Sequence, residues 1–259
     1  MRTLTLLAAC LCATGCGKSD SEREAETAKV DAEMKKSDAE KAARFAVIET
    51  LRSRLVVANG LPRDTAPTKC AAGKGTALLA DRDMVAAVTK PAIDLARDDG
   101  RVEAVDDWKS LSSDAVRMLR EHDWYAAHTG DRMNVVSAEA DNAKRLAPWV
   151  TKGSGDFVVI IDATTKTKPD IVGEISIEGE APFDEGALHG RAIAIDPVGK
   201  RVLCQVTFAA TNSRIVKGGI DKATLRVSAV EDLAHNAHKA IVDKFAAAGL
   251  AITPVEDVY

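Results

Sequence analysis

The chain has 259 residues, of which 46% are hydrophobic, 29% are charged and only 4% are aromatic. Alanine supplies much of the hydrophobic content and buries little area, yet Val, Ile and Leu are too frequent for a disordered chain. The formal net charge is -4 and no block of basic residues occurs, which argues against nucleic acid as a partner. The length suits one domain with extensions or two small domains.

The N-terminal residues have the pattern of a secretion signal. Arg2 supplies a positive charge, and residues 4–13 form an apolar stretch that is too short to cross a bilayer as a helix. The small residues Ala13, Thr14 and Gly15 then lead into Cys16. An ordinary cleaved signal followed by a soluble protein is one interpretation of this segment.

The same residues resemble the lipobox of bacterial lipoprotein precursors, in which the signal is cut just before a cysteine that becomes lipidated. The resemblance covers residues 1–16 only, and no domain family is recognised in the rest. It implies cleavage between Gly15 and Cys16, acylation of Cys16 and anchoring in a membrane. Because Gly17 rather than Asp follows the cysteine, it further implies the outer membrane, facing the periplasm. Two or more acyl chains hold a protein stably at a membrane.

The next segment predicts a long charged helix. Residues 18–44 contain no Gly, Pro or aromatic residue, and opposite charges recur three and four positions apart. We expect a helix over about residues 21–58, roughly 55 Å long at 1.5 Å per residue, which ends near Asn59 and Gly60. A heptad-like seam of alanines would make it a membrane spacer or a coiled-coil surface. The alternative is a solvated single helix or a partly disordered tether.

The remaining residues predict an α+β domain. Short helices are expected first, including one around Met84 and Val88. We then expect four strands in an antiparallel meander, covered on one face by a helix over residues 224–248 and followed by a candidate edge strand at 250–252. The strands are expected at residues 157–161, 171–177, 193–195 and 202–208. The predicted organisation is a signal peptide (1–15), a lipidated N-terminus with a helical stalk (16–59) and a globular domain (60–259).

Two cysteines remain if residues 1–15 are removed and Cys16 is lipidated. Cys70 and Cys204 are an even number in a compartment that permits disulfides, so they are a candidate bridge. The alternative is that Cys204, on the core face of a strand, is a buried free thiol.

The sequence contains no recognisable catalytic or metal-binding pattern. The serine motifs G-x-S-x-G and S-x-x-K and the zinc motif H-E-x-x-H do not occur. His235 and His238 lie three residues apart, but no further ligand completes a metal set. We therefore predict no catalytic residues, no metal and no cofactor. The scarce aromatic residues Trp124, Tyr125 and Trp149 could line a ligand cleft, or they could be core bulk.

These observations favour a lipid-anchored, non-enzymatic interaction module that faces the periplasm and binds another protein of the envelope. One alternative is a periplasmic lipoprotein that binds a small ligand in a cleft near Trp124, Tyr125 and Trp149. Another is a hydrolase whose active-site residues are far apart in the sequence.

Overall fold

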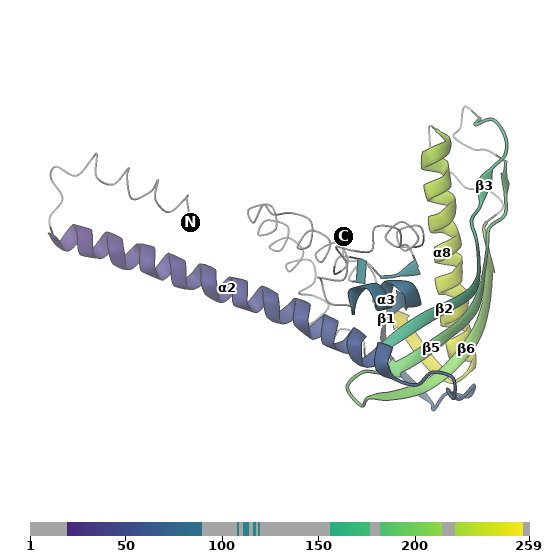
Figure 1. Ribbon diagram of the computed structural model, residues 1–259, viewed down its shortest axis with the longest axis horizontal. Coiled ribbons are helices and arrows are strands. Elements are labelled where there is room, and N and C mark those ends of the chain that lie inside the picture. Colours follow the sequence, from purple (N-terminus) through teal and green to yellow (C-terminus); the bar gives the residue numbers. More distant parts are fainter. Residues whose placement is uncertain are drawn as a thin grey trace. The chain divides into compact units, whose positions relative to one another are not determined.

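The computed structural model describes residues 20–89, 108, 111–113, 116–117, 119, 156–176, 182–213 and 221–255. The chain divides into two compact units, Met1–Ala43 and Arg44–Tyr259. The elements follow one another along the chain as α2 (Asp20–Gly60), β1 (Gly73–Asp81), α3 (Arg82–Val88), β2 (Phe157–Thr167), β3 (Asp170–Ile171), β4 (Phe183–Asp184), β5 (Ala187–Asp196), β6 (Arg201–Thr211), α8 (Lys222–Ala247) and β7 (Leu250–Pro254) (Figure 1).

Helix α2 has 41 residues and contributes to both units. In the first unit the described alanines of its seam, such as Ala28 and Ala32, are exposed. In the second unit Leu51, Leu55 and Ala58 recur at helical spacing and are buried in a hydrophobic core. Among the described residues, no helix is both long enough and apolar enough to cross a membrane.

The main sheet has five strands in the order β6-β5-β2-β1-β7. Strand β1 runs parallel to both of its neighbours, β2 and β7, whereas β2, β5 and β6 pair antiparallel. The sheet is therefore mixed, and it curls around α8 (Figure 1). Strands β3 and β4 form a separate sheet of two strands.

The expected four-stranded antiparallel meander is wrong. Residues 171–176 do not form a strand of the main sheet, in which β2 pairs directly with β5. Instead, Ile171 pairs with Phe183 of β4, and the N–H of Val172 donates to the carbonyl of Pro182. The alternation of burial over residues 171–176 is present, with Ile171 buried, Ile175 half-buried and Val172 exposed, but it does not arise from pairing in the main sheet.

Strand β1 is the element that sequence reasoning missed. It begins with Gly73 and Lys74, which are polar or small, and its hydrophobic run starts only at Ala77. Its parallel neighbour β2 follows much later in the chain, so no hairpin signal marks the pairing. The main sheet therefore contains β1, between β2 and β7, instead of the strand that was expected at residues 171–177.

The two faces of the main sheet have different covers. Helix α8 packs on one face, where Phe245 contributes to a core with Val206 and Phe208 of β6. The other face carries α3 and the second half of α2, with Leu55 packed in the same cluster as Ile160 of β2. After α8 the chain reverses at Gly249, whose φ of 103° suits glycine, and it enters β7.

Candidate functional site

Several residues predicted to form sites lie outside the described residues. These are the cleavage and lipid-attachment residues Gly15 and Cys16, and the candidate cleft residues Trp124, Tyr125 and Trp149. Their predicted roles stay predictions.

Cys70 and Cys204 form a disulfide, with their Cα atoms 5.1 Å apart. Both side chains are buried in the core beneath α8. Cys70 belongs to the segment between α2 and β1, and Cys204 lies in β6. The bond therefore ties that segment to the outermost strand of the main sheet.

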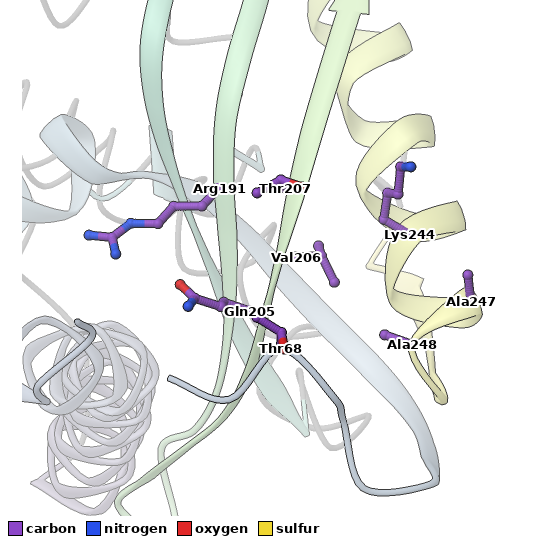
Figure 2. A pocket seen from close by; sticks show the side chains of 8 residues that line it. All are labelled: Thr68, Arg191, Gln205, Val206, Thr207, Lys244, Ala247 and Ala248. Carbon is purple, nitrogen blue, oxygen red and sulfur yellow. The ribbon is translucent and has the colours of Figure 1, made fainter. Parts of the chain in front are cut away.

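We call residues 61–72, between α2 and β1, the tied segment. A groove with a volume of about 520 Å³ lies where β6, the end of α8 and the tied segment meet (Figure 2). Strand β6 contributes to it from both of its faces, through Val206 on one and Thr207 on the other. Its lining residues are Thr68, Arg191, Gln205, Val206, Thr207, Lys244, Ala247 and Ala248. The groove is thus built around an edge of the sheet, because β6 is the last strand on that side.

The tied segment covers only one end of this edge. The backbone N–H of Gln205 donates to the carbonyl of Pro67 at 2.8 Å. The side chain of Gln205 donates from Nε2 to the carbonyl of Ala66 at 2.9 Å, while its Oε1 is buried without a hydrogen-bond partner among the described residues. The segment around Pro67 therefore already occupies the outward side of β6 at one end of the groove.

The remaining backbone groups of the β6 edge point outward from the sheet. The N–H of Gln205 points away from β5, because it donates to Pro67. In an antiparallel strand the backbone groups of alternate residues point to opposite sides, so every second residue after Gln205 also turns its N–H and C=O away from β5. The carbonyl of Thr211 fits this alternation, because it accepts a hydrogen bond from Asn236 Nδ2 at 3.0 Å on the side away from β5. Thr207 and Ala209 lie between them in the same register, and their backbone groups have no partner among the described residues.

The side chains along this edge do not shield it. From Val202 to Thr211 the strand carries no charged residue and no proline. Thr207 and Ala209 are both exposed, and their side chains are small. Sheet edges in soluble proteins usually carry charges, prolines or a cover that prevents pairing with other chains. Between Val202 and Thr211 the β6 edge has neither charges nor prolines.

Lys244 supplies the charge at the groove. It lies in the last turn of α8, is exposed, and forms no ion pair with any described residue. Figure 2 shows its side chain on the α8 side of the groove, across from Thr207. An ammonium group in this position can bind a carboxylate that enters the groove.

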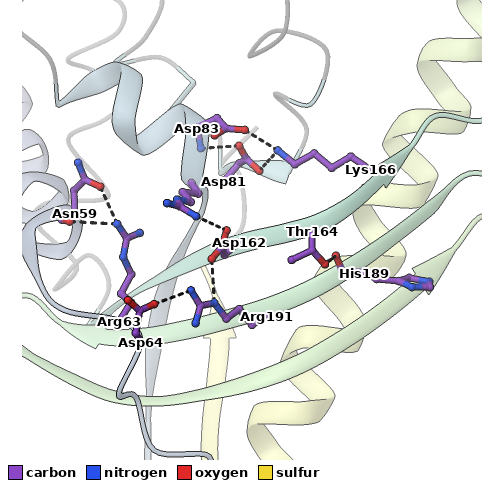
Figure 3. Close-up of polar contacts among 11 residues, drawn as sticks. Asn59, Arg63, Asp64, Asp81, Asp83, Asp162, Thr164, Lys166, His189 and Arg191 are labelled. Carbon is purple, nitrogen blue, oxygen red and sulfur yellow. Dashed lines mark hydrogen bonds and ion pairs between the residues drawn. The ribbon is translucent and has the colours of Figure 1, made fainter.

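A second polar cluster lies on the sheet face opposite α8 (Figure 3). Asp162 accepts hydrogen bonds from Arg82 Nη1 and Arg191 Nε, both at 3.0 Å, and Arg191 Nη2 also reaches Asp64 Oδ1 at 3.3 Å. Burial tends to raise the pKa of Asp162, but the two guanidinium groups outweigh burial and lower the pKa. The carboxylate therefore stays ionised.

Arg63 is the third arginine near Asp162. Its Nη2 donates to the carbonyl oxygen and to Oδ1 of Asn59, each at 3.3 Å. Burial and the nearby charge of Arg82 lower the pKa of Arg63. These hydrogen bonds tie the segment after α2 to the last turn of that helix.

Asp81 and Lys166 form the most buried ion pair described. Lys166 Nζ lies 2.9 Å from Asp81 Oδ2 and 3.1 Å from Asp83 Oδ2. Burial raises the pKa of Asp81, with Lys166 opposing the rise. Burial would lower the pKa of Lys166, but the two carboxylates outweigh it and raise the pKa.

Buried carboxylate–lysine pairs occur in acid–base active sites, but this pair has a structural task. Asp81 caps α3 by accepting from the backbone N–H of Asp83 at 3.0 Å, and its own N–H donates to Ser112 Oγ at 2.9 Å. The charges of the pair compensate each other, and neither Asp81 nor Lys166 lines the groove beside β6. The cluster therefore fastens α3 to β2.

The histidines do not assemble a metal centre in the part of the chain that the structure describes. His238 Nε2 lies 2.9 Å from the carbonyl oxygen of Leu111, and His235 is exposed. No group of three His, Cys, Asp or Glu side chains within the described ranges is placed to hold a metal ion.

Comparisons of the chain with protein-family models, curated proteins and solved structures found no match. The function must therefore be argued from the groove itself. Sequence reasoning missed its residues Thr207, Gln205 and Lys244. One signal was available: a strand of this length without any internal charge is typical of a strand that pairs on both sides or is covered.

Proposed function

We propose that this protein is a lipid-anchored component of the cell envelope whose folded unit binds another envelope protein at the groove beside β6. The lipobox-like residues leading to Cys16 support the anchor, with the outer membrane and the periplasmic side as the proposed location. The single observation that carries the binding role is the open edge of β6, where the outward backbone groups of Thr207 and Ala209 have no partner among the described residues and Thr207 lines the groove.

The energetics favour docking at this edge. Backbone groups at an open strand edge already bond to water, so pairing them with a partner adds little for each bond. The apolar floor formed by Val206, Ala247 and Ala248 adds buried area, and water would leave this floor on binding. Anchoring the folded unit at the membrane would also raise the local concentration of partners in the same compartment.

The anchor is tested by replacing Cys16 with Ala in bacterial cells that incorporate radiolabelled palmitate. We expect the full chain to be labelled and to sediment with membranes, and the Cys16→Ala variant to lose both properties. Continued labelling of the variant would overturn the anchor.

Docking is tested by placing a photo-crosslinking amino acid at position 207 of the full chain in living cells. The matched control is position 227, since Val227 is 56% exposed on α8 and does not line the groove. We expect one discrete crosslinked product from position 207 and none from position 227. Equal products from both positions, or none from either, would overturn docking at this edge.

A further inference from the structure

We infer that the occupant of the groove is an extended peptide segment that adds to β6 as a further strand and places a carboxylate side chain against Lys244. This inference rests on the proposed function and names the chemistry of the partner. The occupant is a segment of another protein rather than a second copy of this chain.

The free edge of β6 offers backbone hydrogen-bonding groups to an occupant of the groove. Each of Thr207 and Ala209 offers one N–H donor and one carbonyl acceptor on the outward side of β6. Extended peptides bind exposed sheet edges through such groups, while pockets beside the edge select alternate side chains. At the neighbouring outward-facing residue, the N–H of Gln205 already donates to a backbone carbonyl of another segment, that of Pro67.

The tied segment covers the β6 edge only as far as Gln205. The tied segment reaches Gln205 through Ala66 and Pro67, and the disulfide fixes that segment in place. Beyond Gln205, among the described residues, the next contact on the outward side is Asn236 at Thr211. The gap is thus bounded at both ends, and its length suits a short strand.

The charge of the occupant follows from the charges at the groove. Lys244 is exposed at the groove and forms no ion pair with a described residue, whereas Arg191 on the other side is already paired with Asp162 and Asp64. A carboxylate in the groove would therefore meet one uncompensated cation. Pairing two β6 edges would instead bring the Lys244 side chains of both copies beside one ribbon, where like charges repel.

The experiment uses the purified full-length protein in detergent micelles and a library of displayed random nine-residue peptides. We expect the enriched peptides to carry Asp or Glu at one fixed position and apolar residues at alternate positions. Lys244→Glu should reverse the preference from acidic to basic residues at that position. Enrichment without an acidic preference, or an unchanged preference in Lys244→Glu, would overturn the inference.

Backbone pairing is tested with Thr207→Pro, which removes an outward N–H without removing a bond to β5. We expect the affinity for the best enriched peptide to fall at least tenfold, while the matched control Thr207→Val keeps it. N-methylation of alternate peptide residues gives a test that does not depend on folding of a variant. N-methylation should abolish binding when it falls on the peptide residues whose N–H groups face β6, and it should leave binding unchanged when it falls on the residues between them. Equal effects at both sets of residues would overturn strand addition.

The outcomes separate this inference from the proposed function. A discrete crosslink from position 207 in cells, together with no enriched peptides, would overturn the extended acidic segment and leave docking at the edge standing. Self-association of the wild-type protein that Thr207→Pro abolishes, seen by analytical ultracentrifugation, would identify a second copy as the occupant and overturn the inference. Enriched acidic peptides without any crosslink in cells would overturn the proposed envelope partner instead.

Discussion

Asp162 and Arg191 lie directly opposite each other on β2 and β5, and Arg191 Nε donates to Asp162 Oδ2 at 3.0 Å. Arg82 binds the other oxygen of Asp162, and Arg191 continues to Asp64. This row of charges joins the segment after α2, the sheet and the start of α3. It makes Asp162 a carboxylate whose ionisation stabilises the folded unit.

The first prediction concerns pH. Because the pKa of Asp162 is lowered in the folded state, its contribution to stability is present above the unfolded pKa and is lost as the pH falls through the folded pKa. We expect Asp162→Asn to reduce the free energy of unfolding at pH 7 by about 1.5 kcal/mol. The difference between wild type and variant should shrink below about pH 4. Urea denaturation at pH 7 and pH 3 measures it.

The control for this prediction is Asp243→Asn, which changes an exposed carboxylate on α8. It should leave stability at both pH values nearly unchanged. A difference for Asp162→Asn that stays constant down to pH 3 would contradict the role assigned to its charge.

The second prediction concerns the pair formed by Asp81 and Lys166. Lys166→Met leaves the Asp81 carboxylate buried without its main cation, and we expect a loss of about 3 kcal/mol at pH 7. Because burial raises the pKa of Asp81, the stability of this variant should fall further as the pH rises through the folded pKa. Chemical denaturation as a function of pH measures both effects.

The double variant Asp81→Asn with Lys166→Met should recover much of that loss. Asn accepts a hydrogen bond as a helix cap does, so α3 keeps its cap while the buried charge disappears. If the losses of the two single variants simply add in the double variant, the two side chains are not coupled.

The third prediction concerns the disulfide. Cys70 and Cys204 are 134 positions apart, and in the chain-entropy model closing so long a loop stabilises the folded state by about 4 to 5 kcal/mol. We expect replacement of both cysteines with Ala to lower the Tm substantially. Mass spectrometry of the non-reduced protein should find the two cysteine peptides linked. Two free thiols in the purified protein would contradict the bridge.

The fourth prediction concerns the two parts of α2. Removing residues 20–43 deletes only residues of the first unit, so we expect the Tm of the second unit to stay nearly unchanged. Leu55→Ala, in contrast, empties a fully buried position and should cost about 3 kcal/mol. Calorimetry of both variants compares the two effects. A large drop on deletion would mean that the first half of the helix stabilises the folded unit.

Local patterns predicted individual elements well. The expected strand at 157–161 is part of β2, those at 193–195 and 202–208 are parts of β5 and β6, and residues 250–252 lie in the edge strand β7. The pairing of strands was not predictable in the same way. Hydrophobic periodicity shows that a strand has a buried face, but it carries no information on which strand lies beside it. The meander order assumed neighbours in sequence, and β1 broke that assumption.

The groove was less predictable than the fold. Thr207 and Lys244 are ordinary residue types, and they meet only because the end of α8 lies beside the edge strand. The candidate pair Cys70 and Cys204 was visible from the sequence, since residues of this type are scarce. Its effect on the edge, through Pro67 and Ala66, depends on a bond between residues far apart in the chain.

The place of β7 in the sheet has a consequence for the timing of folding. Leu250 and Ile252 pair with Gly73 and Gly75 of β1, and the N–H of Val255 bonds to the carbonyl of Ala77. During translation, β1 emerges long before β7, so one of its sides has no strand partner until residues 250–254 have been synthesised. The sheet therefore cannot be completed before β7 has been synthesised, and proteolytic removal of residues 250–254 would turn β1 into an open edge strand.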